Sequence, residues 1–171
     1  MFINFAQANV FNKFSELYHE KIIKICSILG KFKIKVYTSA EYDKCKDNMP
    51  ILIESIHESS FSYYVNKESH DASTTDAGIV FNEELCDTLE LTEEEQMSAI
   101  AHEIGHIIDY FRENKSDNNQ AKEIYADSIA CKLDLSDYLL STLKKILSSE
   151  TISEELKSQI QTRMRWIRYH S

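Results

Sequence analysis

The stretch SAIAHEIGHIIDY, residues 98–110, places two histidines four positions apart inside an otherwise apolar run. Four residues turn an α-helix by about 400°, so His102 and His106 emerge on nearly the same face, one turn apart. Two imidazoles and a carboxylate in such a helix would each cost about 1–3 kcal/mol if left without partners. The stretch therefore predicts a buried helix whose polar side chains share a partner.

Zinc is the partner that fits this spacing. Zn²⁺ accepts imidazole nitrogens in a tetrahedral arrangement, and a catalytic zinc has three protein ligands and leaves one position for water. Glu103 follows His102 and lies about 100° around the helix, beside the pair of histidines. Water on zinc ionises near neutral pH, so we expect Glu103 to act as the general base in peptide hydrolysis.

The third ligand is expected from the next helix. The stretch AKEIYADSIA, residues 121–130, places Glu123 and Asp127 four apart on one face. Two acidic residues at this spacing are most often a solvated face, but here they come one connection after the two histidines. We expect Glu123 to complete the coordination of one Zn²⁺ ion. Asp127 is expected to accept the ring N–H of a histidine ligand and so fix its tautomer.

The rest of the second half is predicted to be helical. Thr92 and Glu95 have the spacing of a capping box, which opens the histidine-bearing helix; we expect that helix to run to about Lys115. Further helices are expected near residues 119–133, after a cap at Ser136, and after Thr151, whose spacing to Glu154 repeats the capping box.

The first half is predicted to carry one helix and a small sheet. Apolar residues at helical spacing indicate a helix over residues 5–29, closed by Gly30. Strict alternation over KFKIKVYT, residues 31–38, is typical of a half-exposed strand. Further strands are expected in residues 51–56 and 61–66, which could form a hairpin, and in GIVFN, residues 78–82.

Composition indicates one helix-rich domain over residues 1–171. The chain is 43% hydrophobic and 27% charged, and it has three glycines and one proline. The net charge of −9 argues against nucleic acid or an anionic membrane as a partner. The scattered cysteines, and the lack of a signal-like start or a long apolar segment, favour a reduced, cytoplasmic protein without a membrane span.

These motifs resemble those of the gluzincin clan of zinc metallopeptidases. The matching stretches are HEIGH, residues 102–106, and EIYAD, residues 123–127, and the similarity covers roughly residues 78–135. The compact single-domain members, the minigluzincins, are most similar in length. The resemblance implies an α+β zincin-like fold with a small N-terminal sheet, an edge strand, an active-site helix and C-terminal helices. The metzincin pattern fails, because it would require Arg112 as a metal ligand.

The resemblance also implies roles for individual residues. His102, His106 and Glu123 would bind zinc, Glu103 would be the general base, and Asp127 would support a histidine. The edge strand would hold a peptide or protein substrate in antiparallel pairing, through the backbone of Ile79, Val80, Phe81 and Asn82. The resemblance assigns no residue to the oxyanion. The candidates are Tyr110, Tyr125, Arg163, Arg165, Arg168 and His170.

The sequence therefore predicts a zinc-dependent endopeptidase, and it leaves two alternatives open. One is a catalytically silent zincin-like binding or regulatory protein that uses zinc structurally. The other is a helical protein without metal. Cys86 follows the expected edge strand and could block the zinc as a latency ligand, although a small buried thiol is the more common role for such a cysteine.

Overall fold

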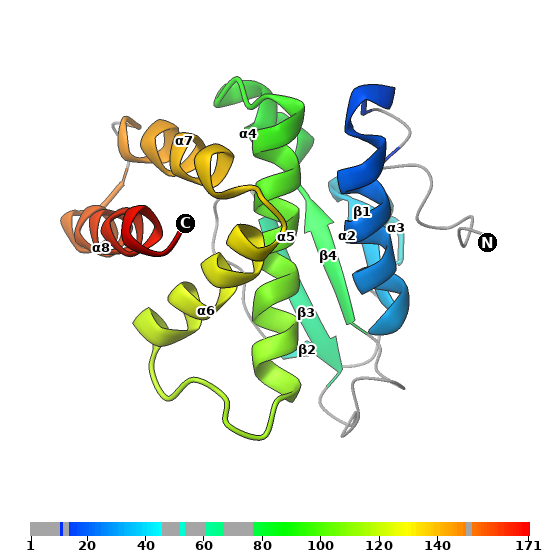
Figure 1. The fold of residues 1–171 in the computed structure, drawn as a ribbon. Helices are drawn as coiled ribbons and strands as arrows, with labels where there is room; N and C mark the ends of the chain where they lie inside the picture. Colours follow the sequence, from blue (N-terminus) through cyan, green and yellow to red (C-terminus); the bar gives the residue numbers. More distant parts are fainter. Residues whose placement is uncertain (1–10, 12–13, 46–51, 54–60, 67–76, 150–151) are drawn as a thin grey trace. The chain divides into compact units, whose positions relative to one another are not determined.

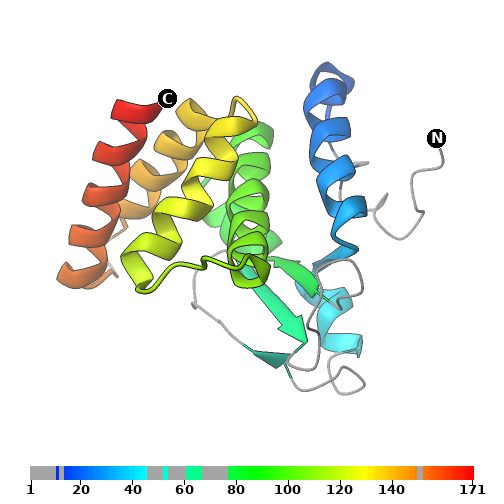
Figure 2. The ribbon, with the colours of Figure 1, turned by 60° about the horizontal axis from the view of Figure 1, so that its bottom comes forward.

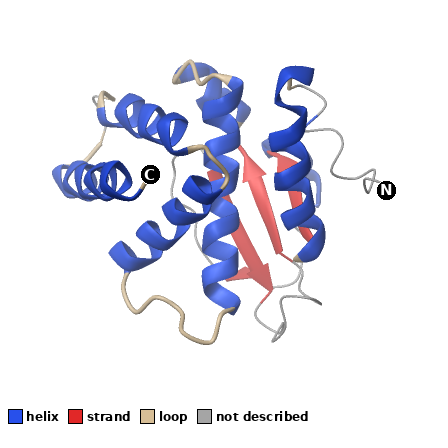
Figure 3. Ribbon diagram, viewed as in Figure 1, coloured by secondary structure: helices blue, strands red, loops and turns tan. Residues whose placement is uncertain are grey.

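A computed structural model describes residues 11, 14–45, 52–53, 61–66, 77–149 and 152–171. The chain forms two compact units, residues 1–86 and 87–171. The first contains the strands and the second contains the long helices (Figures 1 and 3). The structure is thus a helix-rich mixture of helices and strands, as expected for an α+β protein. The expectation that both units belong to one domain stays a prediction.

The first unit is built on a mixed four-stranded sheet. Its strand order is β1-β4-β3-β2, with β1 and β4 parallel and the other neighbours antiparallel. The predicted alternation is confirmed in β1, where Ile34 and Val36 are buried and Lys35 is exposed, but the strand is shorter than the predicted residues 31–38, because residues 31–33 form the end of a helix and a turn. The strands are β1 (Ile34–Thr38), β2 (Leu52–Ile53), β3 (Phe61–Asn66) and β4 (Ala77–Phe81).

The prediction that residues 78–82 form an edge strand is wrong, because β4 lies inside the sheet. Ile79 is in register with Val36 of β1 on one side and with Tyr63 of β3 on the other. Four of the five residues of β4 are buried. A continuous apolar run of this kind is typical of a strand buried on both faces, whereas a half-exposed strand alternates.

This position in the sheet also overturns the predicted role of the strand. The backbones of Ile79, Val80 and Phe81 are already paired on both sides, so they have no edge to offer a peptide. Asn82 lies after the strand, and its Oδ1 accepts a hydrogen bond from the Leu85 backbone N–H at 3.1 Å. Asn82 therefore caps a short helix, α4 (Glu83–Thr88), that the sequence analysis did not anticipate.

The first helix is shorter than predicted, and it does not end at Gly30. A 3₁₀ turn (η1, Glu16–Tyr18) leads into α2 (His19–Lys31), and the predicted part in residues 5–10, 12 and 13 lies outside the described residues. Gly30 is helical, and Lys33 takes the left-handed conformation instead, with φ of 53°. The reversal thus comes three residues later than the glycine pattern suggested.

A second short helix was also missed. Helix α3 (Ser39–Cys45) follows β1 directly. The Thr38 backbone N–H donates to Glu41 Oε2 at 2.9 Å, and the Glu41 N–H donates to Thr38 Oγ1 at 3.2 Å. These reciprocal bonds form a capping box, and the spacing of TSAE in residues 38–41 is the signal that could have predicted it.

The second unit consists largely of α5 (Glu93–Phe111) and the helices that follow it. The predicted capping box is confirmed, because Thr92 N–H donates to Glu95 Oε2 at 2.7 Å and Glu95 N–H donates to Thr92 Oγ1 at 3.3 Å. Helix α5 ends four residues before the expected Lys115. The later helices are α6 (Asn119–Lys132), α7 (Ser136–Leu147) and α8 (Glu154–His170).

Two predicted caps are wrong in detail. Ser136 is the first residue of α7 rather than its cap, and the capping position is held by Leu135, whose side chain makes no cap hydrogen bond. Helix α8 is capped by Ser153, whose Oγ accepts from the Leu156 N–H at 3.2 Å. Thr151 itself lies outside the described residues. Both helices start where predicted to within three residues, because a serine lies at each boundary.

Helix α5 is the centre of the second unit and packs against α6 and α7, while α8 packs on α6 and α7 (Figure 2). The contact with α6 is unusually close. A Cβ atom added at Gly105 would lie 2.5 Å from the Ala126 Cα and 2.8 Å from its carbonyl oxygen. Because glycine has no Cβ, Gly105 allows this close approach of α6. The approach brings the residues that flank Ala126 against the histidine-bearing face of α5.

Among the residues that the structure describes, none of the helices combines the length and the apolar character needed to cross a membrane.

Candidate metal centre

Three predicted ligands converge at the contact between α5 and α6. His102, His106 and Glu123 each offer an atom, and these atoms lie within 4.8 Å of one another. The two histidine Nε2 atoms are 3.1 Å apart. Glu123 Oε2 is 3.4 Å from His102 Nε2, and Glu123 Oε1 is 3.3 Å from His106 Nε2. The structure therefore brings together the ligand set that the sequence predicted from two separate helices.

These separations fit one zinc ion. A tetrahedral ion with ligands at 2.0–2.1 Å has ligand-to-ligand separations of about 3.3 Å, close to the three separations observed. Two imidazole nitrogens and a carboxylate oxygen are also a common donor set for catalytic zinc. The side chain of Glu123 keeps 21% exposure, whereas those of His102 and His106 keep 9% and 8%. The carboxylate thus marks the side from which solvent reaches the centre.

Asp127 supports the first histidine as predicted. The His102 Nδ1 donates a hydrogen bond to Asp127 Oδ1 at 2.8 Å, and Asp127 is fully buried. Because Nδ1 carries the proton in this bond, the other ring nitrogen of neutral His102 keeps its lone pair facing Glu123 and His106. Asp127 therefore orients the imidazole of His102, as expected of a residue that supports a metal ligand.

Arg163 joins the two acidic residues, a role that the sequence analysis missed. Its Nη2 and Nε donate to Asp127 Oδ1 and Oδ2 at 2.7 and 2.9 Å, and its Nη1 lies 2.9 Å from Glu123 Oε2. The side chain is 11% exposed. One guanidinium thus holds both the supporting carboxylate and the ligand carboxylate, which a lysine could not do with the same geometry.

A signal for this role exists in the sequence. Arg163 lies between Ile160, Met164 and Ile167, which are spaced three or four apart and are all buried on α8. A cation on the apolar stripe of a helix must be paired, since burying it alone is very costly. From the sequence, Arg163 was predicted only as one of several oxyanion candidates.

Protonation at the centre follows from burial and from these bonds. Burial and the charge of Arg163 oppose protonation of His102, but its hydrogen bonds to Asp127 and Glu123 prevail and raise its pKa to about 9. Burial lowers the pKa of His106 despite its hydrogen bond to Glu123. His102 is therefore the histidine of the pair that holds a proton beside Glu123, and a metal ion bound by these atoms would have to displace that proton.

The carboxylates of Glu123 and Asp127 stay ionised. Burial by itself would raise the pKa of Glu123, but hydrogen bonds from both histidines and the charge of Arg163 hold it well below its usual range. Burial also opposes ionisation of Asp127, and the charge of Arg163 outweighs it, so that the pKa of Asp127 is lowered. Both groups are therefore in the form that a metal centre requires.

Within the part of the chain that the structure describes, Glu103 forms no ion pair like those that join Glu123 and Asp127 to Arg163. It is 9% exposed, and burial raises its pKa to about 7, with the charge of His102 opposing the rise. A carboxyl group poised near neutral pH can both accept and return a proton. This electrostatic environment agrees with the predicted role of general base.

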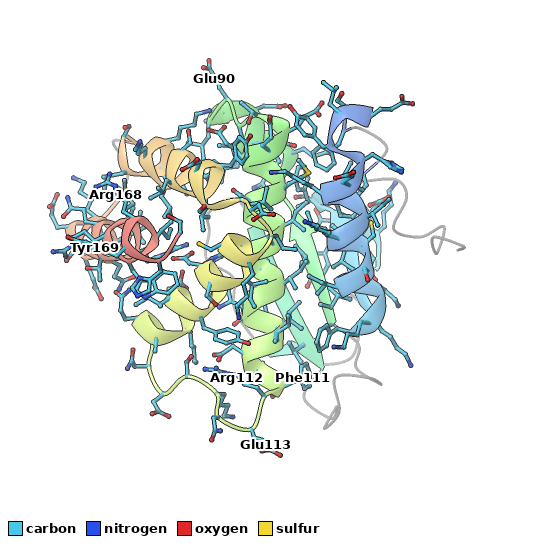
Figure 4. All side chains as sticks on the ribbon, viewed as in Figure 1. Glu90, Phe111, Arg112, Glu113, Arg168 and Tyr169 are labelled. Atoms are coloured by element: carbon cyan, nitrogen blue, oxygen red, sulfur yellow. The ribbon has the colours of Figure 1, made fainter. Side chains whose placement is uncertain are left out.

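The remaining candidate residues for latency or for the oxyanion are described by their burial and by interactions outside the centre. Cys86 carries a buried thiol. Arg168 and Tyr169 project from the outer side of α8 (Figure 4). Tyr125 lies under the guanidinium of Arg112, Arg165 donates to Thr162, and His170 stacks on Trp166.

Comparisons with known proteins identified no relative of this chain. No protein-family model matches the chain, and neither the curated proteins nor the solved structures gave a match. The resemblance to gluzincins thus stays a prediction that rests on the two motifs at residues 102–106 and 123–127.

Proposed function

We propose that the protein is a zinc-dependent endopeptidase of gluzincin type, acting on a peptide or protein substrate. The observation that carries the proposal is the convergence of His102, His106 and Glu123 at separations of 3.1–3.4 Å. Such a convergence of lone pairs needs a positive charge at its centre, and the donor set suits zinc. A zincin-like fold is part of the proposal, supported by the close packing of α6 on α5 at Gly105.

Each residue of the proposed centre would have a distinct role. His102, His106 and Glu123 would hold the ion, while Asp127 and Arg163 fix the positions of two of these ligands. When bound, zinc supplies a Lewis acid and lowers the pKa of water. Glu103 takes a proton from the attacking water at its carboxylate and passes it to the nitrogen of the leaving amine.

Cleavage of a quenched peptide library is the test of this proposal. Wild-type protein, loaded with one equivalent of zinc, should cleave members of the library, and a chelator should abolish the signal. Glu103→Gln should lower the rate by roughly 10²–10⁴-fold, because it removes the base, while zinc content stays stoichiometric. Glu113→Gln is the matched control, since Glu113 is exposed just beyond the end of the same helix (Figure 4).

Two results would contradict the proposal. Equal rates for wild type and Glu103→Gln would show that the signal comes from a contaminant or from another mechanism. A wild-type protein that fails to retain zinc after gel filtration would remove the centre itself.

A second candidate function is a catalytically silent centre that uses zinc for stability in a binding or regulatory protein. The observation that favours it is the pairing of β4 on both sides, which removes the strand expected to hold a substrate. In that case Glu103→Gln would leave the biological activity unchanged, whereas replacing a ligand histidine would lower thermal stability and zinc content together.

A further inference from the structure

A second group of polar side chains lies beyond the metal centre, where α5 ends. Asp109 is 3% exposed, and its carboxylate accepts hydrogen bonds from the backbone N–H of Ser116 at 3.2 Å and from its hydroxyl at 3.0 Å. Arg112 Nε lies 2.6 Å from Asp109 Oδ1, and Arg112 Nη2 donates to Ser116 Oγ at 3.1 Å. We call Asp109, Arg112 and Ser116 the turn clamp.

A contribution to the stability of α5 does not explain why a buried aspartate lies at position 109. The C-terminal end of a helix carries a partial negative charge, so a carboxylate there is unfavourable and a cation is preferred. The last turn of α5 has no basic residue, and Arg112 follows it as the C-cap. The Asp109 carboxylate therefore interacts with the connection that follows α5, and it does not stabilise α5 itself.

The turn clamp is related to α6 in two ways, by its position in the sequence and by a side-chain contact. Ser116 lies two residues before Asn118, whose side chain caps α6 by accepting from the Ala121 N–H at 2.9 Å. The guanidinium of Arg112 lies over the ring of Tyr125, 3.9 Å from its centroid. Figure 4 shows Arg112 where α5 passes into the connection. The clamp thus ends two residues before the cap of α6 and contacts the second turn of that helix through Tyr125.

Tyr125 links the clamp to the metal centre. It lies midway between Glu123 and Asp127 in the sequence, and Ala126, the point of closest approach to Gly105, is its neighbour. A functional constellation must be held within about 0.5 Å of its working geometry. A small slide or rotation of α6 against α5 would carry Glu123 out of range of both histidines.

We infer that the turn clamp is a positioning device that sets the register of α6 against α5, and thereby the affinity of the centre for its metal. The inference rests on the metal centre proposed above, but it does not depend on hydrolysis. Asp109, Arg112 and Ser116 act through Glu123 and do not touch the ligands. They are positioning residues.

The test measures zinc affinity and coordination geometry in folded variants of the full chain. Zinc affinity is measured by competition with a chromophoric chelator, and geometry by the visible absorption of the cobalt-substituted protein. We expect Asp109→Asn to lower zinc affinity about 10–100-fold, the range for residues that support metal ligands, and to alter the cobalt bands. Asp117→Asn is the matched control, because Asp117 is an exposed acid in the same connection.

Milder variants keep the test decisive if Asp109→Asn fails to fold. Arg112→Lys keeps the charge but loses the planar stacking on Tyr125, and Ser116→Ala removes one donor. Both should weaken zinc binding and shift the cobalt spectrum while circular dichroism shows native helix content. Failure of all three variants to fold would overturn the inference in favour of a purely structural role.

The outcomes separate this inference from the proposed function. In one outcome, wild type binds zinc, and the folded variants bind it equally, with unchanged cobalt spectra and only a lower melting temperature. That outcome would overturn the positioning role of the turn clamp and leave the proposed metal centre supported. If wild type binds neither zinc nor cobalt, the proposed metal centre is wrong, and the inference that depends on it is wrong as well. Weaker binding by the clamp variants but not by Asp117→Asn supports the inference, whether or not the protein cleaves peptides.

Discussion

Helix α5 takes part in two buried polar clusters, one at its start and one at its middle, and the two differ in how their charges are neutralised. At the start, the carboxylate of Glu95 accepts from the Thr92 N–H and lies 2.7 Å from Lys145 Nζ. In the middle, His102, His106 and Glu123 turn lone pairs toward one another. The charge of Glu95 is thus met by groups of the protein itself, whereas in the second cluster we propose that a metal ion takes the place of the proton on His102.

This difference separates a stabilising cluster from the cluster that we propose to be functional. Burial, acidity and helix packing are common to both, so none of these features alone identifies a site. What distinguishes the centre at His102 is an excess of acceptors, held in place by Asp127 and Arg163. A cluster that is complete in itself contributes stability, and one that is complete only with a cation is a candidate for binding it.

The largest expected effect comes from removing the cation of each cluster. Arg163→Met leaves the buried Asp127 without its guanidinium partner and with only the hydrogen bond from His102, so the free energy of unfolding should fall by about 3–5 kcal/mol in the metal-free protein. Saturating zinc should restore part of this loss, because it returns positive charge beside the same carboxylates. Lys145→Met should cost about 1–2 kcal/mol, with or without zinc. Urea titrations in chelator and in zinc measure all four values, and equal losses for Arg163→Met in both conditions would contradict the comparison.

Replacing the carboxylates should separate metal affinity from stability. Glu123→Gln keeps the shape but loses the charge of a ligand, so zinc affinity should fall by at least the roughly hundredfold that supporting residues reach. Glu95→Gln should leave zinc affinity unchanged, because Glu95 contacts no ligand. Chelator competition on both variants decides the matter. Similar zinc affinities in Glu123→Gln and wild type would mean that Glu123 does not bind the ion.

The packing that joins the ligands can be tested at the glycines. Gly105→Ala places a methyl group 2.5 Å from the Ala126 Cα, so the helices must separate, at a cost of about 1–3 kcal/mol, and zinc affinity should fall as well. Gly30→Ala is the matched control, because nothing lies within 4 Å of its added Cβ. That variant should gain about 0.5–1 kcal/mol from helix propensity. A tolerated Gly105→Ala, by thermal melting and zinc titration, would disprove the close contact.

The smallest expected effect concerns pH at the start of α5. Burial would raise the pKa of Glu95, but the hydrogen bond and charge of Lys145 and the Thr92 cap lower it overall. Its contribution to stability is therefore present above the ordinary carboxyl pKa of about 4.3 and is lost as pH falls through the lowered value. Glu95→Gln should be less stable than wild type by about 1–2 kcal/mol near pH 7, and the difference should shrink in acid. A difference that stays constant with pH would rule out the ionised pair.

Local sequence signals predicted much of the fold. The spacing of Thr92 and Glu95 placed the start of α5 correctly, and alternation identified β1, because caps and side-chain periods depend only on nearby residues. The short helices α3 and α4 were missed, although Thr38 with Glu41 had the same capping spacing. Strand order was beyond reach, since the apolar run of β4 fits a central strand as well as an edge strand and only long-range pairing decides between them.

The sequence by itself determined which residues could bind a metal ion, because two histidines one helical turn apart can point at a single ion wherever the helix lies. It also indicated Glu123 and Asp127, since their spacing places both on one face. Only the tertiary structure decided that Arg163 holds both carboxylates, and that Asp109 ties the end of α5 to the start of α6. The reason is that these contacts join residues whose proximity depends on how helices pack, and helical periodicity carries no information about packing partners.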